Sequence, residues 1–589
     1  MTTSHSRGSP YPRILCRADA IWPTAHVPLE LAAQEDSHSR PVGTSGAAVA
    51  PKKAGIRGMG RLLLVALGVI GGGLIAYATR WGPWVFSDSV EYLLSAENLA
   101  SGAGLGLRAP SGEFMPLVLH PPLYPLLLAV FGPFAASMLD TARVLDVSLF
   151  GLTVSVTGLL VLRLTRSIVT AASISVLILT SPLLVYLFSG AMSEPLSFFL
   201  GTIGLLLTSR FVEERKEIHL WAAAAAFGAT SLTRYPGVVY CLAGIASILV
   251  LSPAPLVRRL RDASILAIGG ILPLALWLAA SHGELGALAQ RSLPSDLLSA
   301  WDFSRAARGV MVDTVWGWLP FRVIVPGLTY RGRMLVLGAV VLVILGMTYW
   351  SGMRARRMGY PKDRFTPGLS AVGVFGVFAI GHVAFLSIGH VLGMVMFRDI
   401  DERILSPLQP ALFILLWCSL CSISHASGKG KWIGGLSIMA AIGFTVANLP
   451  LLASTLTQLN REGLGYSSPA WRNSPTIAAI EDLPASMIIV SDESEAVQFL
   501  TGRGALEISE LLSSPSHTQY TTFGTDYGDT PQRLFREGRA ALVLFRSAYW
   551  QFYAIYGDRT DDRLEAFTRG LRVFRDLPDG TIYLAPEDG

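Results

Sequence analysis

The sequence alternates between long apolar runs and short loops that are mostly basic. About 20 apolar residues cross a bilayer as one helix, so each run is expected to be a membrane span. The pattern therefore predicts a mainly α, polytopic transmembrane fold. The expected spans are 62–79, 144–162, 168–188, 195–211, 219–233, 236–251, 263–281, 334–350, 368–392, 404–424 and 432–454.

One apolar run is treated differently. "HPPLYPLLLAVFGPF", residues 120–134, is short and rich in proline. A run of about 10–14 apolar residues is more often re-entrant or interfacial than spanning. We expect this segment to remain on the outer side as part of a first outer loop at about 80–143.

The charges in the loops predict the orientation. Cytoplasmic loops carry an excess of Lys and Arg, and Lys52, Lys53, Arg57 and Arg61 precede the first run. With a cytoplasmic start, every short loop expected inside is basic, and eleven spans place the C-terminus outside. These inner loops carry Arg163 and Arg166; Arg210, Arg215 and Lys216; Arg258, Arg259 and Arg261; Arg354, Arg356, Arg357 and Lys362; and Lys429 and Lys431.

Composition agrees with a membrane protein and excludes a soluble one. Apolar residues make up 51% of the 589 residues, charged residues 15%, and the mean hydropathy is +0.48. The net charge of +5 lies in the loops without a basic stripe, so it indicates topology and no nucleic-acid partner is expected. Cys418 and Cys421 form a C-x-x-C inside an apolar run, where small core residues are the better interpretation.

The two ends of the chain differ from the apolar part, 59–455. Residues 1–58 are rich in Ser, Pro, Ala and Gly and predict a disordered cytoplasmic tail, with Met59 a plausible alternative start. Residues 456–589 have the pattern of a small soluble α/β domain outside the membrane. Its expected strands, 487–491, 541–545 and 581–585, alternate with helical patterns at 494–503 and 561–571, which favours a largely parallel sheet.

Ionisable residues gather on the predicted outer face. In "FSDSVEYLLSAENLASGAGLGL", residues 86–107, helical spacing puts Asp88, Glu91, Tyr92 and Ser95 on one face and Glu97 on the other. An interfacial helix with its polar face in water would also explain this pattern. Glu194 stands at the mouth of a span, where the helix dipole alone could account for a carboxylate.

Two arginines are also expected on that face. Arg234 lies between two apolar segments, against the positive-inside trend, and an arginine in a bilayer costs roughly 2.5–3.5 kcal/mol at the centre. It could snorkel to the headgroups, or a phosphate could hold it through bidentate hydrogen bonds. Arg403 belongs to a charged knot with Arg398, Asp399, Asp401 and Glu402, which suits either a solvated turn or a lipid phosphate.

In order along the chain, "SDSVEYLLSAENLASGAGL", "HPPLYPLLLAVFG", "SGAMSEPLSFFL", "LTRYPG" and "ERILSP" resemble the integral-membrane C-type (GT-C) glycosyltransferases. The similarity covers roughly residues 60–455. It points to the bacterial protein O-mannosyltransferase-like enzymes and the aminoarabinose transferase of lipid A. Many protein mannosyltransferases have Asp-Glu in succession in the first outer loop; this chain has Asp88-Ser89, with Glu91 displaced.

The resemblance implies an activity and a partner. Family members use a polyprenyl-phosphate sugar, so the expected reaction is sugar transfer, with inversion, from that lipid to an extracytoplasmic acceptor in the cell envelope. The family's acidic residue in the first outer loop is the catalytic base, which carries over to Asp88. Arg234 and Arg403 are candidates for holding the donor phosphate, and Glu91, Tyr92, His120 and Glu194 for positioning the acceptor or sugar.

Some questions stay open at this stage. Glu194 and His120 could instead hold a divalent cation, but two carboxylates and one histidine are too few to define a metal site. A transporter or flippase of lipid-linked saccharides would use similar charged groups, although such transporters tend to show two related halves, and the sequence has none. A purely structural assembly protein would leave Arg234 unexplained. The sequence does not identify the sugar or the acceptor.

Overall fold

The computed structural model describes residues 50–108, 114–117, 120–281, 309–320, 322, 325–357, 367–391, 402–427, 430–508, 534–535 and 537–586. The chain divides into two units, Met1–Gly55 and Ile56–Gly589, and the second unit is described below. Most of the expected N-terminal tail, and Arg398, Asp399 and Asp401, lie outside the described residues.

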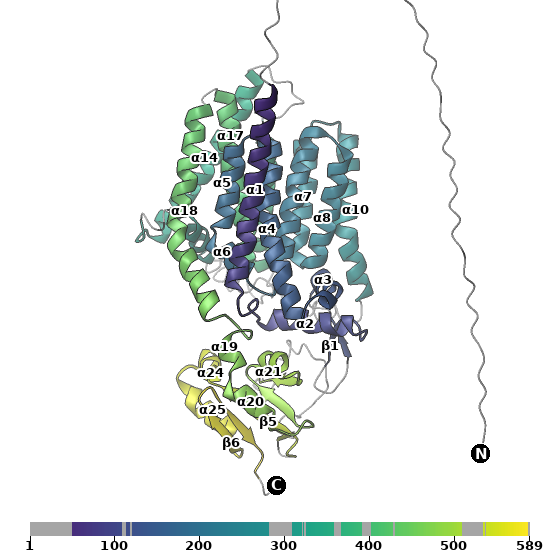
Figure 1. Ribbon diagram of the computed structural model, residues 1–589, viewed down its shortest axis with the longest axis vertical. Coiled ribbons are helices and arrows are strands. Elements are labelled where there is room, and N and C mark those ends of the chain that lie inside the picture. Colours follow the sequence, from purple (N-terminus) through teal and green to yellow (C-terminus); the bar gives the residue numbers. More distant parts are fainter. Residues whose placement is uncertain are drawn as a thin grey trace, which may run out of the picture. The chain divides into compact units, whose positions relative to one another are not determined.

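Long helices run side by side through most of the second unit (Figure 1). They are α1 (Ala50–Ala78), α4 (Met138–Thr165), α5 (Ile168–Leu179), α6 (Pro182–Leu187), α7 (Glu194–Glu214), α8 (Glu217–Thr233), α9 (Val238–Leu251), α10 (Leu256–Ala280), α14 (Tyr330–Arg357), α15 (Leu369–Val391), α17 (Leu408–Ser427) and α18 (Gly430–Arg461). Seven helical stretches in the described residues are long and apolar enough to cross a membrane: Gly58–Ala78, Met138–Thr165, Glu194–Glu214, Leu256–Ala280, Leu369–Gly389, Glu402–Ser427 and Gly430–Arg461. The prediction of a mainly helical integral membrane protein is confirmed.

Helix occupies each of the eleven predicted runs, but two runs are interrupted. The run 168–188 breaks between α5 and α6, because Pro182 starts a new helix and Ser181 caps it by accepting a hydrogen bond from the Leu184 N–H. The run 404–424 begins with a short helix, α16 (Glu402–Leu405), which stops at Ser406-Pro407 before α17 starts. Average hydropathy does not show such breaks, because most residues of each run are apolar.

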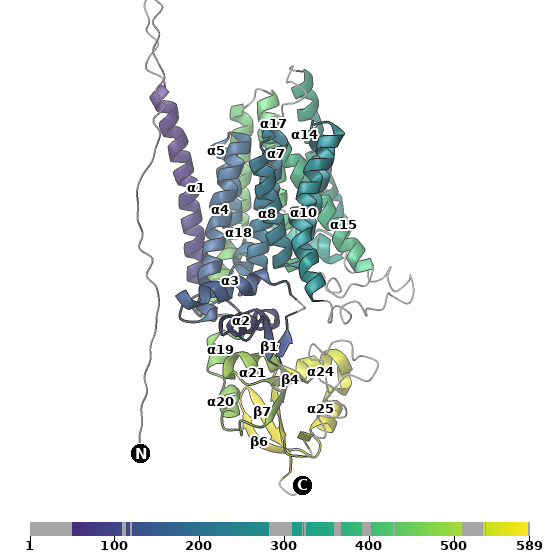
Figure 2. The ribbon, with the colours of Figure 1, turned by 90° about the vertical axis from the view of Figure 1, so that its right-hand side faces the viewer.

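The outer-loop segments form short elements at one end of the bundle. Helix α2 (Ser87–Ala100) lies across the ends of the long helices (Figure 2), followed by a two-stranded antiparallel ribbon of β1 (Gly106–Arg108) and β2 (Phe114–Pro116). Helix α3 (Leu123–Phe131) and the 3₁₀ turn η1 (Gly132–Phe134) come next. The nine residues of α3 rise about 14 Å, well short of a bilayer core, as expected for this segment.

The chain beyond α18 forms a five-stranded mixed sheet. Its strands are β3 (Ile488–Ser491), β4 (Ala505–Glu507), β5 (Ala540–Phe545), β6 (Arg572–Leu577) and β7 (Gly580–Leu584), in the order β4-β3-β5-β7-β6. The short helix α19 (Pro469–Arg472) leads into it. One face of the sheet packs on α20 (Pro475–Ile480) and α21 (Ser494–Thr501), and the other on α24 (Ala548–Tyr556) and α25 (Thr560–Thr568), which follows the 3₁₀ turn η5 (Gly557–Arg559).

The expectation of a largely parallel sheet was wrong. β3 pairs in parallel with β4 and β5, but β7 is antiparallel to both β5 and β6. The cause is a two-residue turn, Pro578-Asp579, which joins β6 and β7 as a hairpin. β6 was missed because its sequence, RVFRDL, lacks the regular alternation of polar and apolar residues that marks a strand, and because it lies at an exposed edge of the sheet.

Candidate active site

The segment before α2 fixes the position of the predicted carboxylate face. Trp84 pairs in parallel with Gly190, and its indole N–H donates to the Tyr186 carbonyl at 2.9 Å. A Cβ at position 190 would overlap the Trp84 ring, so glycine is required there. These contacts place the start of α2 beside the start of α7, which brings together residues about a hundred positions apart.

Helix α2 turns much of its polar face into the protein. Tyr92 and Ser95 are buried, whereas Glu97, on the opposite side, is exposed. Asp88 stands in the first turn with 38% of its side chain exposed. The alternative of a helix with its polar face simply in water does not describe this geometry.

Glu194 lies between two arginines. It is the first residue of α7 and 6% exposed. Its Oε1 accepts hydrogen bonds from Arg403 Nη2 at 2.7 Å and Nε at 3.1 Å, and it forms an ion pair with Arg234 Nη1. Arg403 Nη2 also lies 3.2 Å from Asp88 Oδ2. Three of the residues predicted separately thus join Asp88 in one connected charge cluster.

A tight turn presents Arg234 to this cluster. The residue ends α8 in an extended conformation and leads into the 3₁₀ turn η2 (Tyr235–Gly237) before α9. The Gly237 N–H donates to the Arg234 carbonyl at 2.9 Å, and a Cβ on Gly237 would collide with the backbone of Thr230. The glycine therefore allows the chain to reverse closely enough for the guanidinium to reach Glu194.

A second polar network adjoins the first. His120 Nε2 lies 3.3 Å from Glu91 Oε2, and its Nδ1 lies 3.1 Å from the Tyr92 hydroxyl, which also contacts Ser193 Oγ at 2.9 Å. Burial lowers the pKa of His120, but the hydrogen bond and charge of Glu91 outweigh that effect, so the pKa is raised overall. Burial raises the pKa of the Tyr92 hydroxyl, which keeps it neutral and able to donate.

Six of the seven predicted site residues line one cavity of about 340 Å³; Glu91 reaches it only through His120. The cavity also has apolar and aromatic walls, including Phe198 and Tyr240. Its lining residues are Asp88, Tyr92, His120, Pro121, Glu194, Ser197, Phe198, Arg234, Tyr235, Pro236, Gly237, Tyr240, His382, Arg403, Ile404, Ser406 and Pro407. Their catalytic and binding roles stay predictions.

Sequence reasoning overlooked two ionisable residues: His382, which lines this cavity, and Asp146 of α4, which interacts electrostatically with Glu194. His382 comes from α15, and its Nε2–H donates to the Ile404 carbonyl at 3.1 Å. Asp146 is fully buried in α4, and neither of its carboxylate oxygens has a hydrogen-bond partner within the described part of the chain. Both are ionisable residues inside an apolar run, and such residues suggest a functional site by default, so that signal could have found them.

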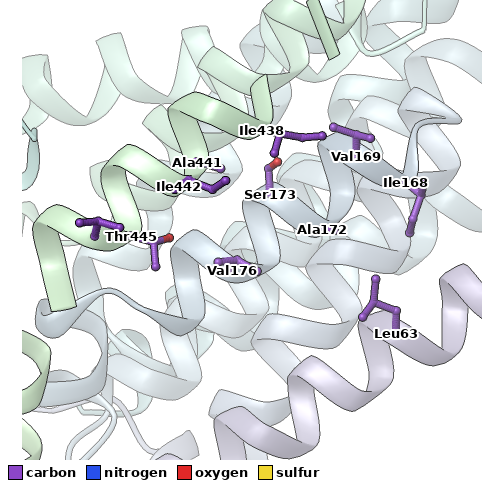
Figure 3. Close-up of a pocket in the computed structure, with 11 residues that line it drawn as sticks. Leu63, Ile168, Val169, Ala172, Ser173, Val176, Ile438, Ala441, Ile442 and Thr445 are labelled. Atoms are coloured by element: carbon purple, nitrogen blue, oxygen red, sulfur yellow. The ribbon is translucent and has the colours of Figure 1, made fainter. Parts of the chain in front are cut away.

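A larger cavity offers different chemistry. It measures about 430 Å³ and lies between α1, α5 and α18 (Figure 3). Leu63, Val169, Val176, Ile438 and Ile442 are typical of its aliphatic lining, which includes no ionisable side chain. It therefore suits hydrocarbon, and it carries no group for acid–base or phosphate chemistry.

The fold belongs to a recognised class, the GT-C fold of polytopic membrane glycosyltransferases. Two crystal structures of ArnT from Cupriavidus metallidurans, one in the apo state and one bound to undecaprenyl phosphate, are similar to this chain. Each has a TM-score of 0.52 and 14% sequence identity, and each comparison covers 90% of this chain and 98% of that chain. No protein-family model and no curated protein matches the sequence.

Proposed function

We propose that the protein is a membrane glycosyltransferase that transfers a sugar from a polyprenyl-phosphate-linked donor to an extracytoplasmic acceptor. The observation that carries the proposal is the cavity in which Asp88 stands beside Arg234 and Arg403. The cavity thus offers a carboxylate base and two cations suited to a phosphate. The shared fold supports the proposal, since one of the similar ArnT structures holds undecaprenyl phosphate.

The proposed reaction is a single displacement with inversion. Asp88 takes the proton of the acceptor hydroxyl or amine while that atom bonds to the anomeric carbon. The bond from this carbon to the phosphate oxygen breaks, and the polyprenyl phosphate leaves with the electron pair. Arg234 and Arg403 stabilise the charge that develops on the leaving phosphate, because preorganised donors do not have to reorient during the reaction.

The remaining predicted residues have contacts that suit positioning. Tyr92, His120 and Glu91 form one chain of polar contacts along the cavity wall and could orient the acceptor or sugar. Glu194 contacts the two arginines and so orients the phosphate-binding groups as well.

The residues present do not fit a divalent cation between Glu194 and His120. The two guanidinium groups on Glu194 Oε1 would repel a cation, and both ring nitrogens of His120 already face protein partners. In the described residues no group of three or more His, Cys, Asp or Glu side chains could hold a metal ion. No step is assigned to a metal.

The test is sugar transfer in proteoliposomes from a panel of radiolabelled polyprenyl-phosphate sugars, with envelope extract as the acceptor source. The wild-type protein should transfer the sugar or slowly hydrolyse the donor, and replacing Asp88 should reduce either reaction. If the labelled lipid crossed the bilayer without any cleavage of the sugar–phosphate bond, the protein would be a transporter of lipid-linked saccharides instead.

We also propose that the cavity opens to the periplasm or cell exterior. The basic loops support this orientation, because they follow helices that end opposite α2. In a cysteine-free background, single cysteines at Gly104 and Ala470 should react with an impermeant maleimide from outside, and one at Glu214 should not. Labelling of Thr165→Cys from outside would contradict the proposed threading.

A further inference from the structure

Both arginines assigned to the donor phosphate already bind carboxylates. Glu194 Oε1 forms an ion pair with Arg234 and accepts hydrogen bonds from two nitrogens of Arg403. Asp88 Oδ2 accepts a hydrogen bond from Arg403 Nη2. Among the described residues, two guanidinium groups therefore face two carboxylates. The formal charges of these four side chains cancel, so together they present little net attraction for a further anion.

The arriving phosphate needs the same donors. A guanidinium binds phosphate and carboxylate oxygens with the same forked arrangement of N–H groups. An anionic phosphate placed between Arg234 and Arg403 is also repelled by Glu194 and Asp88 unless they withdraw. The two kinds of ligand therefore compete for one set of hydrogen bonds.

The cluster has a weaker and a stronger contact. The Arg403–Asp88 pair is the longer one, at 3.2 Å, and its side chains are 31% and 38% exposed. Glu194 is 7% exposed at its side chain and is held by both arginines. Breaking an exposed ion pair costs little, whereas breaking a buried pair leaves an uncompensated buried charge. The Arg403–Asp88 contact is thus the one that a ligand can break most easily.

We propose that Glu194 and Asp88 act as placeholders for the donor phosphate, and that phosphate binding releases Asp88 from Arg403 so that it can serve as the base. The inference rests on the proposed function and adds to it an order of events. The donor binds first, and an acceptor that arrives before the donor meets an Asp88 already engaged by a cation. In this order Asp88 becomes available as a base only after the donor has bound.

The test measures the sign of a change in affinity. Calorimetric titration of the full chain in lipid nanodiscs with a polyprenyl phosphate should show tighter binding by Glu194→Gln and by Asp88→Asn, by about 3–10-fold, where tenfold corresponds to about 1.4 kcal/mol. If the carboxylates served only to orient the arginines, both variants would bind more weakly or equally. Either of those results overturns the inference.

Controls separate this inference from the proposed function. Arg403→Gln should bind polyprenyl phosphate more weakly than wild type, and the parent polyprenol, which lacks phosphate, should show no difference among the variants. Asp88→Asn changes an exposed side chain, so it remains informative even if the buried Glu194→Gln variant does not fold. If wild type did not prefer polyprenyl phosphate to polyprenol, the proposed function would fail together with the inference.

Infrared difference spectra give a second measurement. Adding polyprenyl phosphate to wild type should change the carboxylate stretching bands, because Asp88 loses its cationic partner. The part of this change that is due to Asp88 should be absent in Asp88→Asn. Identical difference spectra from the two proteins would show that phosphate binding leaves Asp88 where it was.

Discussion

The carboxylates of the candidate-site cavity and those of the C-terminal sheet are stabilised in different ways. In the cavity, Asp88 and Glu194 contact guanidinium groups. At the sheet, Asp492 accepts hydrogen bonds from the Phe545 N–H at 2.8 Å and the Ser547 hydroxyl at 3.0 Å, and Glu507 accepts one from Ser494 at 2.7 Å.

This difference determines what each group can do. Burial raises the pKa of Asp492 to about 7 and that of Glu507 to about 8, and neighbouring carboxylates add to the effect. A cationic partner favours the ionised carboxylate, whereas burial favours the protonated one. At Asp492 burial outweighs the hydrogen bonds from Phe545 and Ser547, which favour the ionised form. The carboxylates in the cavity are therefore paired with cations. The sheet carboxylates instead have pKa values near neutral pH.

The largest expected effect tests the role of the cavity. Asp88→Asn preserves the shape of the side chain but removes the base, so turnover should fall by about 10²–10⁴-fold. Sugar transfer in proteoliposomes measures it. Glu97→Gln, on the exposed side of the same helix, is the matched control and should retain activity. A wild-type rate for Asp88→Asn would show that the cavity carboxylate is not the base.

The next effect concerns the cations. Arg234→Ala removes charge-assisted hydrogen bonds, which contribute about 1.5–3 kcal/mol each, so the KM for the donor should rise by about 10–100-fold. The control is Arg261→Ala, because Arg261 pairs with Glu217 at an exposed position, with 54% of its side chain exposed. An unchanged donor KM in Arg234→Ala would remove Arg234 from the phosphate site.

A smaller effect links the polar network to pH. Because Glu91 raises the pKa of His120, the pair stabilises the fold fully below pH 6.5, and this contribution is lost as pH rises through the raised pKa. Glu91→Gln should therefore lower the melting temperature at pH 6 by about 1–3 °C and have less effect at pH 9. Thermal unfolding in nanodiscs at the two pH values measures this. An equal loss at both would indicate a packing effect only.

The last expected effect is at the sheet. The raised pKa of Asp492 means that folding favours its protonated form, so stability should decline from about pH 4 to about pH 7 and level off above. Asp492→Asn keeps an acceptor for the Phe545 N–H without the charge and should flatten that decline. Thermal unfolding between pH 5 and 8 distinguishes the two proteins. A slope equal to that of wild type would assign the pH dependence to other carboxylates, with Glu507→Gln as the next variant.

The comparison also shows what could be predicted from the sequence. Helical spacing correctly separated Tyr92 from Glu97, and the apolar runs placed Glu194 and Arg234 at the ends of helices. These features depend on neighbouring residues. The pairing of Arg403 with Asp88 joins positions 315 residues apart, and no local pattern encodes which cation meets which carboxylate.

The misses have different physical causes. The β6–β7 hairpin was overlooked because the irregular pattern of β6, RVFRDL, did not indicate a strand next to the turn. Asp146 was overlooked because one carboxylate does not disturb the average hydropathy of an otherwise apolar helix.

The segment before α2 also has a second neighbour. Val85 pairs with Gly465, the Tyr466 N–H donates to the Val85 carbonyl at 2.9 Å, and the Ser467 hydroxyl donates to the Pro83 carbonyl at 2.6 Å. The helix that carries Asp88 is therefore built partly on the chain that leads into the C-terminal sheet. Exchanging the C-terminal domain would alter the support of helix α2. A replacement C-terminal domain would have to supply the same glycine turn, and a chimera lacking it would keep the membrane helices but not the position of Asp88.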